Sequence, residues 1–126
     1  MKIDTKASGK VFFTGEYMAL EGGKSIILST PQEARVSIIE NNKPHNIFRS
    51  SISNSSYPFM FNDDLNIAWL REDPEELGTI LQQSIRKFKK TFTGKTISID
   101  TSEFFFEKKK IGIGSSAAVS VAITLA

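Results

Sequence analysis

The stretch that decides the fold of this chain reads KKKIGIGSSAA and occupies residues 108–118. Three lysines come first, followed by two glycines one residue apart, two serines and two alanines. This order is typical of a loop that leads into a helix, which we expect to begin near Ser115 and to run to the last residue. The first N–H groups of such a helix have no intrahelical partner and carry partial positive charge, and glycines let an anion approach the main chain. The stretch therefore predicts a phosphate-binding loop.

Two other interpretations of this stretch stay open. It is not a Walker A loop, which requires Gly-x-x-x-x-Gly-Lys-Ser/Thr, but Gly112, Gly114 and Ala117 fit the looser dinucleotide pattern Gly-x-Gly-x-x-Gly/Ala. A purely structural interpretation is a glycine-rich turn capped by serine and packed closely because its residues are small.

Composition sets limits on the class of protein. The chain has 126 residues, which predicts one domain at most. Its 16 basic and 14 acidic side chains give a net charge of +2, too balanced to favour a nucleic-acid partner. Cysteine is absent, which excludes disulfides and thiolate metal sites, and the single histidine, His45, does not make a zinc site. No apolar run reaches the roughly 18 residues of a membrane span, and no signal-peptide core begins the chain. We expect a cytoplasmic protein without a membrane partner.

The last 12 residues, 115–126, contain no charge and no helix stop signal. A helix that is apolar on nearly every side has to be covered by neighbouring elements. We therefore expect this chain to be the N-terminal piece of a longer protein.

A second cluster of interest is SGKVFFTGEY at residues 8–17. The apolar run 11–13 predicts a strand, and Gly15 interrupts it. Lys10 precedes the run, and Glu16 and Tyr17 follow it. Taken alone, these three residues favour a solvated strand end with a half-buried aromatic ring. A turn at residues 21–24 then predicts a second strand at residues 25–29.

The middle of the chain predicts strands and one amphipathic helix. Residues 34–40 and 46–52 flank an Asn-Asn-Lys-Pro turn and predict a hairpin. Asp73 is the expected N-cap of a helix that has Pro74 as its first residue and Glu76 in a capping box, and Gly94 is expected to end it. Residues 95–100 predict a strand. The apolar stripe of the helix comprises Leu77, Ile80, Leu81, Ile85, Phe88 and Phe92. Together these elements predict an α+β fold with helices on one face of a sheet.

The clusters at residues 8–17 and 108–118 are more informative together than separately. Residues 9–23, GKVFFTGEYMALEGG, resemble the first motif of the GHMP kinases, a family of small-molecule kinases. Residues 110–119, KIGIGSSAAV, resemble the second motif of that family, its phosphate loop. The motifs stand in the expected order. The sequence Gly-Glu-Tyr, the later Leu-Glu-Gly and the lysine run are most similar to the phosphomevalonate kinase branch.

The resemblance implies a fold and a function. Residues 1–126 would form an incomplete GHMP kinase N-terminal domain, a ribosomal-protein-like α/β sandwich with a left-handed strand–helix–strand crossover. The implied reaction is ATP-dependent phosphoryl transfer, with Mg²⁺, to a small phosphorylated alcohol or acid in isoprenoid precursor synthesis (the mevalonate pathway). The partner would be this small-molecule phosphate acceptor.

Residue roles follow from the same resemblance. Lys10 would act at the reaction centre as the catalytic residue, Glu16 and Tyr17 would line the acceptor site, and Ser116 would be a Mg²⁺ ligand. The residues that would bind the ATP phosphates are Lys109, Lys110, Gly112, Gly114, Ser115, Ser116 and Ala117.

Departures from the family pattern leave alternatives open. The usual Pro-Gly-Lys is Ser8-Gly9-Lys10 here. The catalytic aspartate, the acidic metal ligand and the third glycine motif of the family come from later sequence, so we expect residues 1–126 alone to transfer no phosphate. A mevalonate kinase, a diphosphomevalonate decarboxylase and a degenerate, non-catalytic nucleotide-binding domain are the alternatives. A dinucleotide-binding enzyme is disfavoured, because its loop follows the first strand of a parallel sheet.

Overall fold

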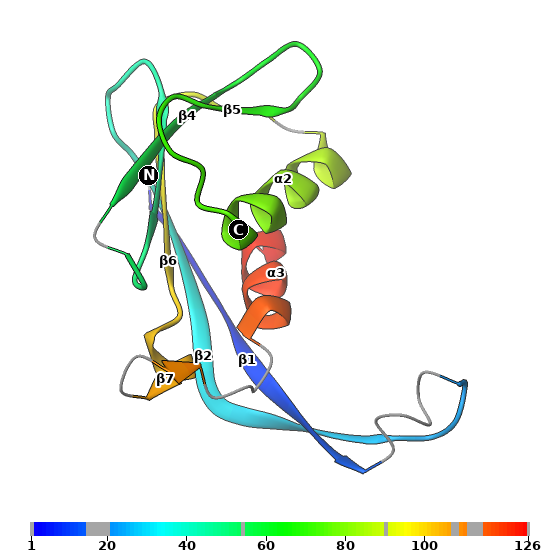
Figure 1. Ribbon diagram of the computed structural model, residues 1–126. Coiled ribbons are helices and arrows are strands. Elements are labelled where there is room, and N and C mark those ends of the chain that lie inside the picture. Colours follow the sequence, from blue (N-terminus) through cyan, green and yellow to red (C-terminus); the bar gives the residue numbers. More distant parts are fainter. Residues whose placement is uncertain are drawn as a thin grey trace.

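The computed structural model describes residues 2–14, 21–53, 55–89, 91–106, 109–110 and 115–125. These residues form one large mixed sheet, a small two-stranded sheet and a set of helices (Figure 1). The strands are β1 (Lys2–Thr14), β2 (Ile26–Glu40), β3 (Asn46–Ser50), β4 (Ser56–Phe61), β5 (Ile67–Trp69), β6 (Lys95–Asp100), β7 (Phe105–Phe106) and β8 (Lys109–Lys110). The helices are α2 (Glu76–Phe88), the 3-10 helix η1 (Ser102–Phe104) and α3 (Ser115–Leu125).

The large sheet has the strand order β1-β2-β6-β3-β4-β5. Only β3 and β6 pair in parallel, and the other neighbours are antiparallel. The chain leaves β3, forms β4, β5 and α2, and returns through β6 beside β3. The predicted α+β class is confirmed. The left-handed crossover stays a prediction.

The predicted hairpin between residues 34–40 and 46–52 is wrong, because β6 lies between these two strands. β6 pairs with β2 on one side and with β3 on the other, so its main chain is hydrogen-bonded along both edges. Ile97 and Ile99 are buried on one face, as an internal strand requires. The turn after β2 is tied to the approach to β6: the Asn41 N–H donates to the Gly94 carbonyl at 2.9 Å.

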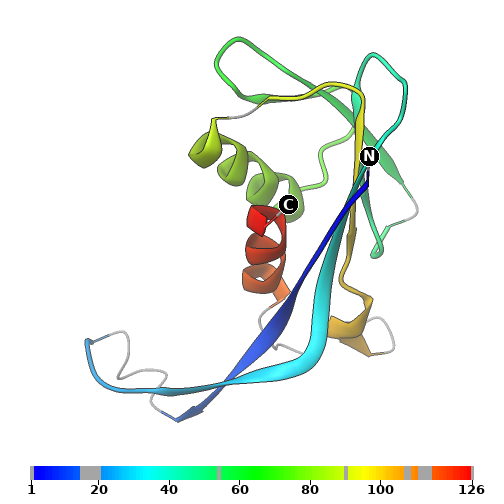
Figure 2. The same ribbon diagram turned by 180° about the vertical axis from the view of Figure 1, so that it is seen from behind.

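β2 is one strand, whereas the sequence predicted two separate strands at residues 25–29 and 34–40. Ser8 pairs with Glu33 and Lys10 pairs with Ser29, so the register shifts where Pro31 lies. A proline fits such a position because it has no N–H to donate to a ladder. Beyond the shift, β1 and β2 continue as a two-stranded ribbon that projects from the body of the molecule (Figures 1 and 2).

Both α-helices lie on the same face of the sheet (Figures 1 and 2). α3 begins at Ser115, as predicted, and its small buried residues Ala118 and Ala122 let it pack closely on the strands. The core is one cluster that the sheet and both helices share. Its largest fully buried side chains are Phe48, Phe59, Phe104, Ile99, Val36 and Val119.

α2 begins and ends at residues other than the predicted ones. Asp73 accepts a hydrogen bond from the Glu75 N–H at 2.7 Å, but no side chain caps the helix, so the capping box with Glu76 does not form. The Asp73 carboxylate closes a local turn instead, and Glu75 takes a positive φ of 57° before the helix starts. The helix ends with Lys89 in the left-handed conformation, before Gly94 is reached.

Aromatic rings fill the space between α2 and the β4–β5 end of the sheet. The rings of Phe59 and Trp69 lie 5.2 Å apart, and Phe61 and Phe92 meet edge to face at 5.1 Å. These rings belong to the packing between the sheet and α2.

Candidate functional site

Lys10 lies on β1 at the point where the ladder with β2 changes register. The ladder passes directly from the pair Ser8–Glu33 to the pair Lys10–Ser29, and the buried Gly9 lies between them. An irregularity of this kind bends a strand and redirects its side chains. Lys10 is exposed and sits where the ribbon leaves the main sheet.

Ser115, Ser116 and Ala117 are the first three residues of α3. The N–H groups of a first helical turn have no partner within the helix, and the first turn of α3 carries no acidic side chain. An anion placed there meets main-chain donors and the positive end of the helix dipole. Ala117 is exposed on this turn.

The structure describes only two of the remaining predicted site residues. Lys109 and Lys110 form β8 and pair with Phe106 and Phe105 of β7. Gly112 and Gly114, together with Glu16 and Tyr17, lie outside the described residues.

One hydrogen bond sets α3 against β1. The Thr5 hydroxyl donates to the Ala122 carbonyl at 2.6 Å, and the strand and the helix run in opposite directions (Figures 1 and 2). Ser115 lies seven residues before Ala122, a helical rise of about 10 Å. Ser8 lies three residues after Thr5, which is also about 10 Å along a strand. Equal lengths measured from this bond along two antiparallel elements lead us to expect the main chain around Gly9 near the start of α3.

Comparisons with known proteins give the fold. No protein-family model matches the chain, and no curated protein matches its sequence. Among solved structures, Streptococcus pneumoniae phosphomevalonate kinase in complex with phosphomevalonate and AMPPNP is 23% identical at a TM-score of 0.71, over 98% of this chain and 35% of that chain. Methanococcus jannaschii mevalonate kinase is 19% identical at a TM-score of 0.69, over 98% of this chain and 38% of that chain. Lactococcus lactis galactokinase in complex with galactose is 12% identical at a TM-score of 0.69, over 97% of this chain and 31% of that chain.

The chain has the fold of the GHMP kinases. It spans between 31% and 38% of the length of the three kinases named above. The structural similarity shows the GHMP kinase fold, whereas sequence identities this low do not show the substrate. In the described part of the chain, no helix has both the length and the apolar character to cross a membrane.

The described residues contain no group of three histidine or carboxylate side chains that could hold a metal ion. A hard cation such as Mg²⁺ prefers oxygen ligands and is often bound through one or two protein groups plus substrate phosphates. The donors at the start of α3 therefore suit a phosphate chain that brings its own cation better than they suit a free ion.

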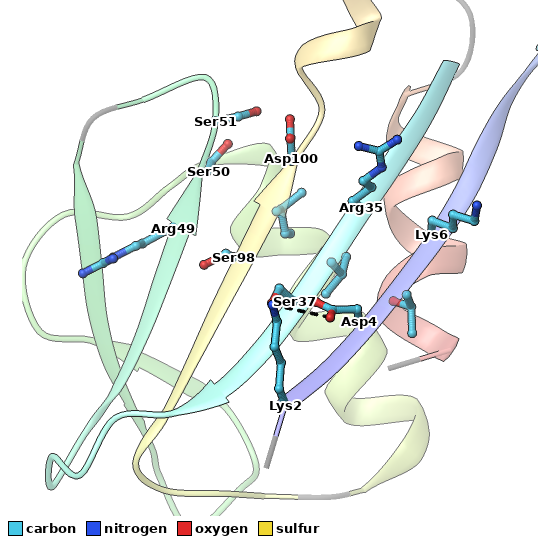
Figure 3. Close-up of a pocket in the computed structure, with 13 residues that line it drawn as sticks. Lys2, Asp4, Lys6, Arg35, Ser37, Arg49, Ser50, Ser51, Ser98 and Asp100 are labelled. Carbon is cyan, nitrogen blue, oxygen red and sulfur yellow. Dashed lines mark ion pairs between the residues drawn. The ribbon is translucent and has the colours of Figure 1, made fainter. Parts of the chain in front are cut away.

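The opposite face of the GHMP-fold sheet carries a hollow of about 760 Å³ that the sequence did not predict (Figure 3). The signal was present in the alternation of Lys2, Asp4 and Lys6 along β1, which places these side chains on one face. Its cations are largely paired: Lys2 lies 3.6 Å from Asp4, and Arg35 lies 3.6 Å from Glu103. This hollow lies across the sheet from α3 and contributes nothing to the predicted phosphate site.

Asp100 lines the same hollow on the open face of the sheet. The Ser102 hydroxyl and main-chain N–H both donate to its Oδ1, at 2.7 and 2.9 Å, and they lower the pKa of this carboxyl group. Asp100 is thus held as a carboxylate by local hydrogen bonds that also order the start of η1.

Proposed function

We propose that this chain is the ATP-binding part of a GHMP small-molecule kinase that phosphorylates a small phosphorylated alcohol or acid, as phosphomevalonate kinase does. The main support is the antiparallel arrangement of β1 and α3, fixed by the bond from Thr5 to Ala122. From this arrangement we infer that the break in β1 that carries Lys10 lies near the start of α3, which has the sequence Gly-Ser-Ser-Ala.

In this proposal the nucleotide phosphates rest on the first turn of α3. The N–H groups at Ser115, Ser116 and Ala117 donate to the phosphate oxygens, and Lys109 and Lys110 add positive charge from β8. Gly112 and Gly114 would let the main chain approach the phosphates closely. Phosphoryl transfer depends mainly on positioning and on neutralising charge, which main-chain donors and lysines supply.

Lys10 would stabilise the transferring phosphoryl group or the acceptor oxygen, and Glu16 and Tyr17 would contact the acceptor. When bound, Mg²⁺ would bridge phosphate oxygens and reduce their repulsion, with the Ser116 hydroxyl as a protein ligand. Family membership, the phosphomevalonate-type acceptor, the mevalonate pathway and a cytoplasmic location are parts of the same proposal.

Nucleotide binding by the 126-residue chain tests the proposal directly. Isothermal titration with MgATP should show saturable binding, and Ser116→Asp should weaken it at least tenfold because a carboxylate then opposes the phosphates. Thr124→Asp adds the same charge at the far end of α3 and should leave binding unchanged. An equal effect of both variants, or no binding by the unchanged chain, contradicts the proposal.

The acceptor is tested on the longest protein that the gene encodes. Mevalonate, its phosphate and its diphosphate are offered in turn with MgATP, and turnover of the monophosphate supports the phosphomevalonate kinase assignment. Preference for mevalonate or its diphosphate would assign the alternative kinase or the decarboxylase. Nucleotide binding without any turnover by that protein would assign a non-catalytic domain.

A further inference from the structure

The hollow on the open face of the sheet has serine side chains at its centre. Ser37 of β2 and Ser98 of β6 are direct partners across two neighbouring internal strands, and both residues are partly buried. In the described part of the chain, neither hydroxyl group makes a hydrogen bond. Each can therefore donate a hydrogen bond to a bound molecule, and accept one from it.

Charged side chains surround this centre (Figure 3). Among the described residues that line the hollow, the cations are Lys2, Lys6, Arg35 and Arg49. The carboxylates are Asp4 and Asp100. Four cations against two carboxylates leave the lining with an excess of two positive charges.

The ion pairs around the hollow leave this excess accessible. The side chain of Arg49 makes no ion pair with the described residues. Lys6 lies 3.4 Å from Glu33, and Arg35 lies 3.6 Å from Glu103, but neither glutamate lines the hollow. Ion pairs between exposed side chains are weak, so an anion in the hollow can share these two cations.

The strand register arranges four of the lining residues in a row. Asp4 pairs with Ser37, Ser37 with Ser98, and Ser98 with Arg49, across the strands β1, β2, β6 and β3. Figure 3 shows the four side chains in this order. Neighbouring strands lie about 4.8 Å apart, so a carboxylate, two hydroxyls and a guanidinium follow each other over roughly 14 Å. Such a row fits an elongated molecule that has hydroxyl groups at one end and an anion at the other.

We propose that this hollow binds a small polyol that carries one phosphate group. A phosphate monoester has about −1.5 to −2 charges at pH 7, which matches the positive excess of the lining. The Arg49 guanidinium donates to the phosphate oxygens, a geometry that suits its planar fork. The Asp4 carboxylate accepts hydrogen bonds from the polyol, and the two serine hydroxyls bind its remaining hydroxyl groups.

The carboxylates of the lining limit the kind of anion that fits. Asp4 and Asp100 repel additional negative groups, so a polyphosphate or a nucleic acid is disfavoured relative to a singly phosphorylated molecule. The hollow lies across the sheet from α3, so this site is separate from the nucleotide site proposed above and does not depend on it.

Amide NMR spectra of the ¹⁵N-labelled chain, titrated with sorbitol 6-phosphate, test the proposal. We expect saturable shifts at Ser37, Ser98 and Arg49. Sorbitol and inorganic phosphate should each bind about tenfold more weakly, because each supplies only half of the contacts. Equal binding of inorganic phosphate or of tripolyphosphate would overturn the proposal, since the site would then select charge alone.

Variants show whether the shifts report the hollow itself. Arg49→Gln keeps most of the side-chain length, removes the charge at an exposed position and should weaken binding about tenfold. Arg71→Gln, at an exposed arginine that does not line the hollow, should leave binding unchanged. Ser116→Asp, which tests the nucleotide site, should leave it unchanged as well.

Thermal denaturation of the same variants separates a lost contact from a lost fold. Arg49→Gln should melt at the temperature of the unchanged chain, because the side chain makes no ion pair that the substitution could break. Shifts that are confined to α3, or equal losses of binding in Arg49→Gln and Arg71→Gln, would overturn the assignment of a ligand to the hollow.

Discussion

The Thr5 hydroxyl and the Ala122 carbonyl, 117 positions apart, are joined by a hydrogen bond of 2.6 Å. This bond connects β1, an edge strand of the sheet, to α3. Replacing Thr5 by valine keeps the shape of the side chain and leaves the carbonyl without its donor, which should lower the free energy of unfolding by about 1 kcal/mol. Urea denaturation measures the change. Thr124→Val, at an exposed position of α3, is the matched control and should change stability much less.

Phe59 is the centre of the aromatic packing between the sheet and α2. It is fully buried, and its ring lies within 6.3 Å of three other rings, those of Phe61, Trp69 and Phe92. Phe59→Ala should destabilise the chain by about 3–5 kcal/mol because it leaves a large cavity. Met60 is 46% exposed, so Met60→Ala should cost far less. Similar losses in thermal denaturation would contradict this account of the core.

Lys89 ends α2 with a φ of 52° and a ψ of 38°. A left-handed conformation is unfavourable for a residue with a Cβ and easy for glycine. Lys89→Gly should therefore raise the free energy of unfolding by about 0.5–1 kcal/mol. Lys87→Gly removes the same side chain inside the helix and should lower stability instead. Chemical denaturation of both variants decides the point, and a loss of stability in Lys89→Gly would contradict the assigned helix end.

Asp100 should make stability depend on pH in the acid range. Its pKa in the folded chain is lowered by the two hydrogen bonds from Ser102. The carboxylate therefore contributes stability above the unfolded-state pKa of about 3.9, and this contribution is lost as the pH falls through the lower folded-state pKa.

Ser102→Ala removes one of these donors and should move the pKa of Asp100 up toward its ordinary value. NMR titration of the Asp100 carboxyl carbon measures the shift. Ser98→Ala, which removes a hydroxyl of the same hollow that is not bonded to Asp100, should leave the titration unchanged. An unchanged titration in Ser102→Ala would show that the hydroxyl does not set the pKa.

Lys10 should discriminate between nucleotides if it acts at the transferring phosphoryl group. We expect Lys10→Met to weaken ATP binding several-fold more than ADP binding, because only ATP carries the group that the ammonium would contact. Lys24, on the exposed turn before β2, is the control, and Lys24→Met should affect neither nucleotide. Equal losses for ATP and ADP in Lys10→Met would place Lys10 away from the transferred group.

Local signals in the sequence predicted the elements whose structure is locally determined. α3 begins at the serine pair, where glycines precede the helix and small residues follow, and β6 has its predicted bounds because alternation and flanking turns define it. The wrong hairpin and the divided β2 depend on which strands meet, and that is decided by burial between distant segments. At the start of α2 the sequence was not decisive, because an aspartate carboxylate can either cap a helix or close a turn. Asp73 closes a turn here.

Of the candidate site, the start of α3 followed from the residue pattern. Lys10 was expected just before a short strand, whereas it lies within β1. The roles of these residues stay predictions. The hollow on the open face was missed because it needs side chains from β1, β2, β6 and β3 at once, and no local pattern reports their order.

The position of β6 has a consequence for how the chain reaches its native state. A turn at residues 41–45 favours local pairing of β2 with β3, yet in the native sheet β6, which follows much later in the chain, separates them. Long-range strand pairing is slow because the intervening chain must first lose entropy. On the ribosome, the centre of the sheet therefore cannot be completed until β4, β5, α2 and β6 have all been synthesised.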